Sequence, residues 1–577
     1  MDDVDAVQAQ IARNMLGSGD WVTARLDGVA YLEKSPLVYW MMAGSFRLFG
    51  VHDWAARLPL ALAALLLCWA TYRLGRWSIG PEAGFYAGTA LATCAGLFLF
   101  TRILIPDAAL TLTITVALWT FLRLLEPEEQ HRLRWACTLG LSMGAGLLLK
   151  GLVAVVFPVG AALVYMAATR QLLQKHTWQR LRLITVLSVM LLVAAPWHVL
   201  ATLRNPPYFA FTMRSVPGQY HGFFWFYFFN EHLLRFLNLR YPRDYNTVPR
   251  PLFWLLNLVW LFPWSAYLPA AFKLEYSPAT RAGRLRLMCL CWIGFVMVFF
   301  TFSTTQEYYS MPIYPALALL IGSALVAAGP AVRFARWTLA ALSAVLSVAL
   351  AAILFLVRSI PAAGDISTAL TQNPELYTLS MGHITDLTLT AFAFLRLPVA
   401  LAALAFGIIA VGLALKGRSG RRAVLVTAVG MILFLQAARV ALIRFDNYLG
   451  SYPLASSLQQ APPGQLIEGN AYYAFSSVFF YTNRTALLWN GRVNNLEYGS
   501  YAPDAPQVFI GDARLAEVWR SPERQYLLIY GTEMPALEKL LGRAALYPVA
   551  RCADNYLLTN RPLPQSGSVQ GSAQPPR

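Results

Sequence analysis

The sequence predicts a mostly α-helical, polytopic integral membrane protein with a small α/β region at its C-terminal end. The chain is 57% hydrophobic and only 13% charged, whereas soluble domains carry roughly 25% charged residues. Twelve stretches are apolar over, or nearly over, the roughly 20 residues that a membrane-spanning helix requires. After residue 443 the apolar runs become short and alternate with polar helical stretches, a pattern typical of an α/β domain.

Residues 1–55 precede the first apolar stretch and predict two amphipathic helices lying on the membrane surface. A second apolar face runs from Leu37 to Phe49. Between the two helices lies the segment YLEKSP, in which Glu33 and Lys34 place opposite charges side by side. The first helix is indicated by apolar residues at helical spacing and by two glycine stop signals: Val4, Val7, Ile11, Met15, Gly17 and Gly19.

The connecting loops predict the orientation of the spans. Alternate loops hold most of the arginines and lysines, and by the positive-inside rule these loops face the cytoplasm. Residues 1–55 then lie outside with no span before them, so we expect one further upstream span and thirteen in the complete protein. The twelve stretches are 56–79, 82–101, 107–125, 133–149, 152–169, 181–203, 251–272, 285–302, 312–329, 333–357, 397–416 and 421–443.

The C-terminal part predicts an α/β domain over residues 444–561 and a tail over 562–577. The tail has too few apolar residues to fold and is expected to be disordered. The membrane domain then covers residues 1–443. Within the α/β domain the expected strands and helices are Gln507–Gly511, Tyr526–Tyr530, Asp512–Arg520 and Glu533–Leu541.

Charge and cysteine usage exclude other classes of protein. The net charge of +17 suggests orientation by cytoplasmic basic residues and contact with anionic membrane lipid. No basic stripe interleaved with aromatic residues occurs on a polar segment, so nucleic acid is not an expected partner. The six cysteines lie almost entirely in apolar stretches, and no disulfide framework or cysteine metal site is expected.

The predicted outer face collects charged and aromatic side chains beside apolar sequence. Taken singly, each has an ordinary interpretation, such as a helix cap, a solvated ion pair or a snorkelling lysine. A charge inside the membrane costs about 2.5–3.5 kcal/mol, so several on one face predict a shared polar cavity at the outer membrane surface. The candidates are Asp2, Asp3, Asp5, Tyr31, Glu33, Lys34, Arg102, Asp107, Lys150, Glu231, His232, Arg235, Tyr308 and Tyr309.

Mixed charges in such a cavity suit a substrate that carries a sugar on a phosphate. Lys and Arg neutralise a phosphate through charge-assisted hydrogen bonds of about 1.5–3 kcal/mol each. Carboxylates orient hydroxyl or amino groups or accept a proton, and Tyr31, Tyr308 and Tyr309 can stack on a sugar ring. No cofactor is required, and one histidine makes a weak metal site, so a divalent metal at Glu231 and His232 stays open.

Six segments resemble bacterial membrane glycosyltransferases of the GT-C class. The nearest resemblance is to the undecaprenyl-phosphate aminoarabinose transferases that modify lipid A, with the protein O-mannosyltransferases as broader kin. The resemblance covers most of residues 1–330, and it implies thirteen spans followed by a periplasmic α/β domain. The segments are DDVDAVQAQIARNMLGSGDWV, YLEKSPLVYW, RILIPDAALT, LLLKGLVAV, NEHLLRF and QEYYSMPIYPALALL.

The resemblance implies roles for individual residues. Asp3 matches the catalytic acid of the first outer loop, with Asp2 and Asp5 as rivals, because the family commonly has Asp-Glu where this chain has Asp-Asp-Val-Asp. Glu33 would pair with the ammonium group of the sugar, and Asp107 would position the sugar or the acceptor. The residues expected near the donor phosphate and sugar are Lys34, Arg102, Lys150, Glu231, His232, Arg235 and Tyr309, although Ser35 here separates Lys34 from Pro36.

The expected activity is transfer of 4-amino-4-deoxy-L-arabinose from undecaprenyl phosphate to lipid A phosphates, at the periplasmic face of a bacterial inner membrane. This modification would give resistance to cationic antimicrobial peptides, and the enzyme is expected to act as a monomer.

Three alternatives remain open at this point. A mannosyltransferase would use a polyprenyl-linked hexose and act on protein or glycan. A transporter of lipid-linked sugars is disfavoured because the sequence shows no pair of broken helices and no ionisable residue near the middle of a span. A membrane sensor is the weakest alternative, because it leaves the charges of the outer loops unexplained.

Overall fold

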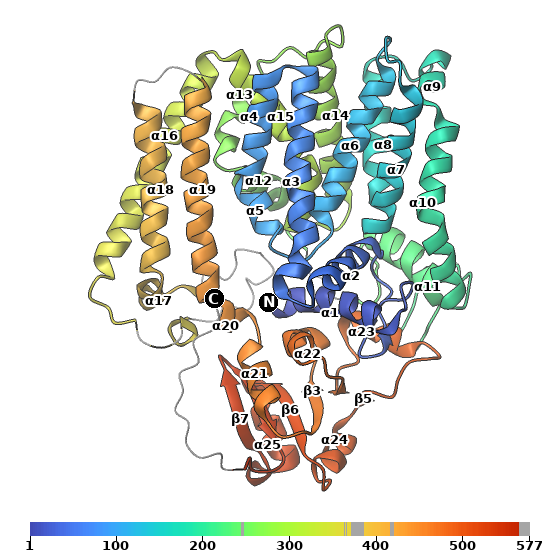
Figure 1. Ribbon diagram of the computed structural model, residues 1–577, viewed down its shortest axis with the longest axis vertical. Helices are drawn as coiled ribbons and strands as arrows, with labels where there is room; N and C mark the ends of the chain where they lie inside the picture. The colour runs from blue at the N-terminus through green and yellow to red at the C-terminus, as the bar shows by residue number, and fades with distance from the viewer. Residues whose placement is uncertain (244–246, 363, 365, 371–385, 416–419, 565–577) are drawn as a thin grey trace.

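The computed structural model describes residues 1–243, 247–362, 364, 366–370, 386–415 and 420–564. Long helices form a bundle, and a β-sheet lies beyond one end of it, with the N-terminal helices between the bundle and the sheet (Figure 1). We call this end of the bundle the sheet end. Most of the tail predicted to be disordered, 562–577, lies outside the described residues.

The first outer loop forms the two helices that the sequence predicts, α1 (Asp3–Ser18) and α2 (Leu37–Phe49). A short hairpin of β1 (Arg25–Leu26) and β2 (Val29–Ala30) lies between them. α1 packs between α2 and the C-terminal helix α22 (Ser476–Thr482), and its position at the membrane surface stays a prediction. Small and apolar residues on more than one face of α1 make this possible: Ala6, Val7, Ala9, Ile11, Ala12 and Met15 are all buried.

All twelve predicted stretches are helical. Eight helices of the described chain are long and apolar enough to cross a membrane, and a bent pair would make nine; the counts of twelve and thirteen spans stay predictions. The helices are α3 (Asp53–Ser78), α4 (Pro81–Ala92), α5 (Ala95–Phe100), α6 (Asp107–Leu125), α7 (Arg132–Lys150), α8 (Val153–Ala168), α10 (Leu183–Arg204), α12 (Arg250–Trp260), α13 (Leu268–Ala271), α14 (Arg281–Phe302), α15 (Tyr314–Ala327), α16 (Pro330–Leu356), α18 (Arg396–Ala414) and α19 (Gly420–Arg444).

Short helices connect these elements. Two of them shape the site described below: a π-helix, η1 (Trp225–Leu234), and a 3-10 helix, η3 (Glu307–Ile313). The others are α9 (Lys175–Leu181), α11 (Gly222–Phe224), η2 (Trp264–Tyr267), η4 (Ile366–Ala369) and α17 (Leu389–Phe394).

Two of the predicted spans are broken, and the breaks touch each other. One span is divided into α4 and α5, and the other turns by 99° between α12 and the helical segment Trp264–Ala271. Ala95 donates its backbone N–H to the carbonyl of Phe262 at 3.1 Å, and the Trp264 indole donates to the Thr93 hydroxyl at 3.0 Å. Each break therefore satisfies polar groups that the other frees. The argument from unbroken helices against a transporter was wrong, because uniformly apolar composition conceals such a pair.

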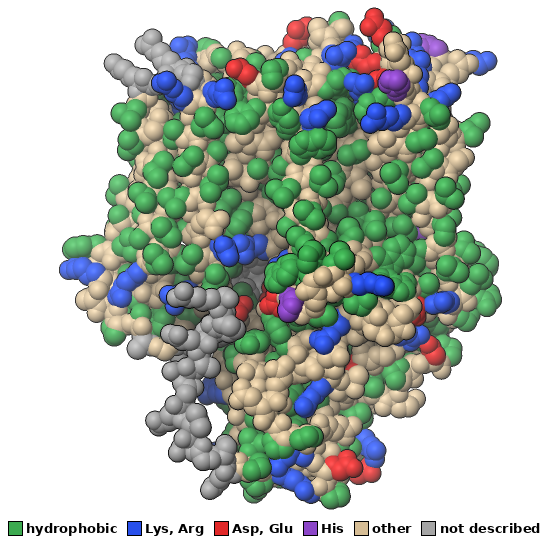
Figure 2. All heavy atoms as spheres, in the orientation of Figure 1, with side chains coloured by type: hydrophobic (Ala, Val, Ile, Leu, Met, Phe, Trp, Pro, Cys, Tyr) green, Lys and Arg blue, Asp and Glu red, His purple; other side chains and the backbone are tan. Residues whose placement is uncertain are grey.

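The surface supports a membrane protein. Apolar side chains dominate the belt around the middle of the bundle, whereas charged side chains gather at the far end and around the sheet end (Figure 2). This distribution places the apolar belt in the bilayer, as expected of a polytopic membrane protein.

The C-terminal region contains a six-stranded sheet with the order β5-β4-β3-β6-β8-β7. Strand β8 pairs antiparallel with both of its neighbours, β6 and β7. The strands and helices predicted at 507–541 are confirmed as β5, α24, β6 and α25, with small differences at their ends. One sheet face shares a hydrophobic core with α1 and α2; the domain boundaries at 443 and 561 stay predictions. The elements are α20 (Asp446–Leu449), α21 (Tyr452–Gln460), β3 (Gln465–Gly469), η7 (Tyr472–Ala474), β4 (Ala486–Trp489), α23 (Asn494–Glu497), η8 (Gly499–Tyr501), β5 (Phe509–Ile510), α24 (Asp512–Trp519), β6 (Gln525–Tyr530), η9 (Gly531–Glu533), α25 (Met534–Leu541), η10 (Arg543–Ala545), β7 (Tyr547–Cys552) and β8 (Asn555–Thr559).

Candidate functional site

A cavity of about 500 Å³ opens at the sheet end of the bundle, where α6, the α7–α8 turn, η1 and η3 meet the first outer loop and the C-terminal region. Its walls are apolar along α8 and α14, where Val156, Phe157, Phe299 and Phe300 line it. The charged side chains gather elsewhere on the wall. Ten of the fourteen candidate residues line this one cavity: Tyr31, Glu33, Lys34, Asp107, Lys150, Glu231, His232, Arg235, Tyr308 and Tyr309.

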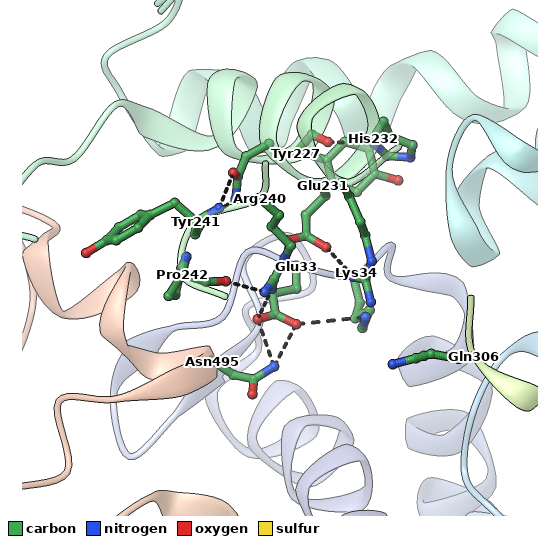
Figure 3. Close-up of polar contacts among 12 residues, drawn as sticks. Glu33, Lys34, Tyr227, Glu231, His232, Arg240, Tyr241, Pro242, Gln306 and Asn495 are labelled. Carbon is green, nitrogen blue, oxygen red and sulfur yellow. Dashed lines mark hydrogen bonds and ion pairs between the residues drawn. The ribbon is translucent and has the colours of Figure 1, made fainter. Parts of the chain in front are cut away.

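Arg240 joins the two glutamates of the site. Its fully buried guanidinium donates to Glu33 at 2.8 Å and forms a second ion pair with Glu231. Arg235 pairs with the other oxygen of Glu231 at 2.8 Å. Figure 3 shows Glu33 and Glu231 on opposite sides of Arg240. The outcome is a buried network that ties η1 to the YLEKSP segment.

The arginines keep Glu231 ionised. Burial alone would raise the pKa of this carboxyl, but the charges of Arg240 and Arg235 lower the pKa to about 2. A carboxylate held by two guanidinium groups accepts hydrogen bonds and does not donate a proton at neutral pH. Glu231 therefore stabilises the site as an anion and is not a general acid.

Glu33 and Lys34, the adjacent charged residues of the YLEKSP segment, have different surroundings. Glu33 is 5% exposed and accepts from both Arg240 and Asn495, the latter at 2.7 Å to each carboxylate oxygen. Protein groups thus contact both oxygens of Glu33, and its expected pairing with the ammonium of the sugar stays a prediction. Lys34 keeps 34% of its side chain exposed, lines the cavity and stands 3.8 Å from Glu33.

Asp107 and Lys150 form the second ion pair of the cavity. Asp107 begins α6, Lys150 ends α7, and their charged atoms lie 2.6 Å apart. The ammonium of Lys150 also lies 5.0 Å from the ring centre of Tyr308 and 4.9 Å from that of Tyr309. Asp107 is 1% exposed, and its oxygen Oδ2 has no hydrogen-bond partner among the described residues.

His232 holds the α7–α8 turn. The backbone N–H of Leu152 donates to His232 Nε2 at 3.1 Å, so the ring proton resides on Nδ1, which donates to the Tyr227 carbonyl at 2.6 Å. Burial also lowers the pKa of His232, which favours the neutral ring. The turn itself requires Gly151, whose φ is +73°. His232 therefore does not supply the positive charge that we expected at a phosphate.

The donor set at Glu231 and His232 does not fit a divalent metal. Both carboxylate oxygens of Glu231 bind arginines, and both nitrogens of His232 are hydrogen-bonded to backbone groups. Within the described ranges, no group of three His, Cys, Asp or Glu residues could hold a metal ion. The residues of this cavity accordingly act through protein ion pairs.

The acidic residues at the start of α1 lie outside the cavity. Asp2 caps α1, and Asp3 accepts from Ser451 at 3.0 Å and from the backbone of Ser477 at 2.8 Å, so Asp3 faces the C-terminal region. Asp5 is fully buried. It forms an ion pair with Arg57 of α3 and accepts a hydrogen bond from the backbone N–H of Leu104, in the loop before α6. Helical rotation presents Val4 and Gln8 to the cavity and leaves Asp3 outside its lining, and the expected catalytic role of Asp3 stays a prediction.

Arg102 also lies outside the cavity lining. Its guanidinium packs over the ring of Phe98, 4.6 Å from the centroid. Arg102 and Lys34 therefore do not line the same cavity, and the expected contact of Arg102 with the donor phosphate stays a prediction.

The structure adds residues that sequence reasoning missed. Arg240 lies in a predicted outer loop, between Leu239 and Tyr241, and this place in the loop is the sequence signal that could have found it. Asn495 and Tyr473 come from the C-terminal region, and Tyr473 binds the Tyr31 hydroxyl at 3.0 Å. Asn495 is 462 positions from Glu33 in the chain, and no local pattern predicts such a contact.

Comparisons with known sequences give the same family signal. Residues 33–199 match the family model described as dolichyl-phosphate-mannose-protein mannosyltransferase. The undecaprenyl phosphate-alpha-4-amino-4-deoxy-L-arabinose arabinosyl transferase of Aeromonas salmonicida is 30% identical over 55% of this chain and 54% of its own. The enzyme of the same name from Pectobacterium carotovorum is 27% identical over 67% and 66%. The chain spans about half the length of the first of these curated relatives.

Solved structures cover nearly the whole chain. The crystal structure of ArnT from Cupriavidus metallidurans bound to undecaprenyl phosphate superposes with a TM-score of 0.78, at 24% identity, over 96% of this chain and 93% of that one. The apo form of the same protein gives a TM-score of 0.74, at 22% identity, over 97% and 93%. The family match, the named relatives and this shared architecture together identify the chain as a polytopic membrane protein of the GT-C glycosyltransferase fold.

Proposed function

We propose that the protein transfers 4-amino-4-deoxy-L-arabinose from undecaprenyl phosphate to phosphate groups of lipid A. The observation that carries this proposal is the charge balance of the cavity. Among the described residues of this site, four cations (Arg240, Arg235, Lys150 and Lys34) face three carboxylates (Glu33, Glu231 and Asp107), and Lys34, 3.8 Å from the already paired Glu33, is the cation in excess. A sugar phosphodiester carries one negative charge, which Lys34 would neutralise.

The shape of the cavity also suits a polyprenyl donor. The apolar wall along α8 and α14 offers a surface for a prenyl chain, and the polar end offers Lys34 and Arg235 to the phosphate. The relatives named as undecaprenyl-phosphate transferases, and the similar structure with undecaprenyl phosphate bound, support this assignment.

The reaction exchanges one glycosidic bond for another. A phosphate oxygen of the acceptor attacks the anomeric carbon of the sugar, and the bond from that carbon to the donor phosphate oxygen breaks. The departing undecaprenyl phosphate takes the bonding electrons and gains one negative charge, which Lys34 stabilises with help from Lys150 and Arg235. The acceptor phosphate is already an anion, so no strong general base is required. Asp107, which lines the cavity beside Lys150, positions the sugar.

The cavity would face the periplasm of a bacterial inner membrane. The loops rich in Lys and Arg lie at the other side of the predicted topology, which supports this orientation through the positive-inside rule. Adding a cationic sugar lowers the negative charge of lipid A, and this change would reduce the binding of cationic antimicrobial peptides.

A hexose transferase is the second candidate. The matched family model describes mannosyltransferases, and the three carboxylates that line the cavity in the described part of the chain are each paired with an arginine or a lysine, as a neutral hexose would permit. Mass spectrometry of the product distinguishes the two candidates: aminoarabinose on a lipid phosphate, or a hexose on protein or glycan. A transporter would move the donor across the bilayer without cleaving the sugar–phosphate bond.

The deciding experiment is transfer of radiolabelled aminoarabinose from undecaprenyl phosphate to lipid A by the purified full-length protein in proteoliposomes. We expect transfer by the wild type and a loss of at least about tenfold in Lys34→Ala, since one charged phosphate contact is worth about 1.5–3 kcal/mol. Lys273→Ala, an exposed lysine outside the cavity, is the matched control and should retain activity. Full activity of Lys34→Ala would refute the assigned role, and lipid A unchanged by expression of the gene would refute the activity.

A further inference from the structure

Gln8 is a polar side chain that α1 presents to the cavity. Val4 and Gln8 lie about one helical turn apart on the same face of α1, and both line the cavity. The hydroxyl of Tyr39, a fully buried residue of α2, donates to Gln8 Oε1 at 2.8 Å. This hydrogen bond orients the carboxamide, and Gln8 Nε2 has no hydrogen-bond partner in the part of the chain that the structure describes. Gln8 is partly exposed, so its two N–H donors lie on the wall of the cavity without a protein acceptor.

Two tyrosines add uncharged polar groups to the same part of the cavity. Tyr473 lies in η7, which packs against α1, and Tyr473 and Gln8 both line the cavity. The hydroxyl of Tyr473 lies 3.0 Å from the hydroxyl of Tyr31, another lining residue. We call Gln8, Tyr31 and Tyr473 the neutral wall. It is built by the first outer loop and the C-terminal region, whereas the apolar wall is built by α8 and α14.

Glu33 places the neutral wall beside Lys34. The hydroxyl of Tyr31 donates to Glu33 Oε2 at 3.3 Å, and the ammonium of Lys34 lies 3.8 Å from the same oxygen (Figure 3). Lys34 is the cation that the proposed function assigns to the donor phosphate. In a polyprenyl-phosphate sugar, the prenyl chain and the sugar are bonded to different oxygens of this phosphate. A donor whose prenyl chain follows the apolar wall can therefore place its sugar against the neutral wall.

Uncharged donors suit a sugar better than a phosphate. Proteins bind phosphates through charge-assisted hydrogen bonds, which are about twice as strong as hydrogen bonds between neutral groups. A hydroxyl group of a sugar is neutral and can accept a hydrogen bond from a carboxamide N–H. The prenyl chain has no polar group that could accept one. Of the three parts of the donor, the sugar is thus the part that matches Gln8.

We propose that Gln8 binds a hydroxyl group of the donor sugar, and that Tyr39 is a positioning residue that orients the Gln8 carboxamide. This inference rests on the proposed function for the class of substrate, a sugar on a polyprenyl phosphate, but it does not depend on which sugar is transferred. Tyr473 completes the neutral wall from the C-terminal region, so this region takes part in binding the sugar as well as in holding Glu33.

Equilibrium binding to the full-length protein in nanodiscs tests the role of Gln8. The two probes are undecaprenyl phosphate and undecaprenyl phosphate that carries aminoarabinose. Gln8→Met keeps an unbranched side chain and removes the carboxamide. We expect this variant to bind the sugar-bearing probe about fivefold more weakly, as for the loss of one neutral hydrogen bond, and to bind undecaprenyl phosphate as the wild type does. Equal losses for both probes, or no loss for either, would overturn the role of Gln8.

Gln10→Met is the matched control, because it makes the same chemical change on the same helix. Gln10 is 4% exposed, lies outside the cavity lining and donates to Asn14 at 2.8 Å. Its affinities for both probes should equal those of the wild type. A loss confined to the sugar-bearing probe in this control would show that any change in α1 has the same effect, and would overturn the assignment to Gln8.

A double-variant cycle tests the role of Tyr39. Tyr39→Phe removes the hydroxyl that orients Gln8, and it should weaken binding of the sugar-bearing probe by about twofold. In the Gln8→Met background, Tyr39→Phe should cause no further loss, because the group that it orients is gone. An additional loss of the same size in the double variant, or no loss in Tyr39→Phe alone, would contradict a positioning role.

A third probe, undecaprenyl phosphate that carries mannose, separates this inference from the proposed activity. If the wild type prefers the mannose probe and Gln8→Met removes that preference, the choice of aminoarabinose fails and the role of Gln8 stands. If aminoarabinose is bound through Gln8 but is not transferred to lipid A, the proposed activity alone fails. If the wild type binds neither sugar-bearing probe more tightly than undecaprenyl phosphate, the sugar site at Gln8 is overturned.

Discussion

Replacing Arg240 by methionine tests the buried network most directly. Methionine keeps an unbranched side chain of similar reach and removes the charge. The guanidinium of Arg240 is fully buried, lies 2.8 Å from Glu33 and also binds Glu231. Removing one partner of a buried ion pair costs about 3–5 kcal/mol, because the remaining charge stays buried. Glu231 keeps Arg235, and Glu33 keeps Asn495, so we expect the lower end of this range, about 3 kcal/mol.

The assay is thermal unfolding of the purified protein, together with binding of undecaprenyl phosphate. Arg240→Met should lower the unfolding temperature and weaken donor binding, because the YLEKSP segment loses its anchor to η1. Adding Glu33→Gln removes the charge that Arg240→Met leaves unpaired, and a glutamine can still bond to Asn495. The double variant should therefore be more stable than Arg240→Met alone. Wild-type stability in the single variant, or no recovery in the double variant, would refute this reasoning.

Three further outcomes follow from particular contacts. Gly151→Ala should lower both thermal stability and transfer, because the φ of Gly151 is +73° and a Cβ at this position would lie 2.1 Å from Nε2 of His232. The control is Gly17→Ala, where a Cβ would meet nothing within 4 Å and thermal stability should stay unchanged. Asn495→Ala should weaken donor binding by about tenfold, because it removes charge-assisted hydrogen bonds to Glu33. If the variant bound the donor as tightly as the wild type, the C-terminal region would not act on the cavity. Burial raises the pKa of Asp27 to about 7, so between about pH 4 and pH 7 the folded state keeps a proton that the unfolded state releases. Thermal stability should therefore fall as the pH rises through this range. Asp27→Asn should flatten this dependence of stability on pH, and an unchanged slope in the variant would contradict the assignment to Asp27.

Much of the fold was predictable because the relevant signals are local. A run of apolar residues has only a few stable conformations in a bilayer, and helices satisfy their own backbone groups. All twelve apolar stretches, both helices of the first outer loop and the strands near 510 and 528 were found in this way. The sequence also predicted that the outer charges share one cavity, and ten of the fourteen candidate residues do line it.

The partner of each charge was decided by the tertiary structure. Composition and spacing place Glu33, Asp107 and Glu231 at one membrane surface, but they do not say which cation each carboxylate binds. Arg240 takes two of these carboxylates, and Asn495 reaches Glu33 from 462 positions away. The rotation of α1 likewise turns Asp3 toward the C-terminal region and away from the cavity. Electrostatic and hydrogen-bond energies fall steeply with distance and angle. Differences of a few ångströms, which only the packed structure determines, therefore separate a group that binds substrate from one that holds the fold.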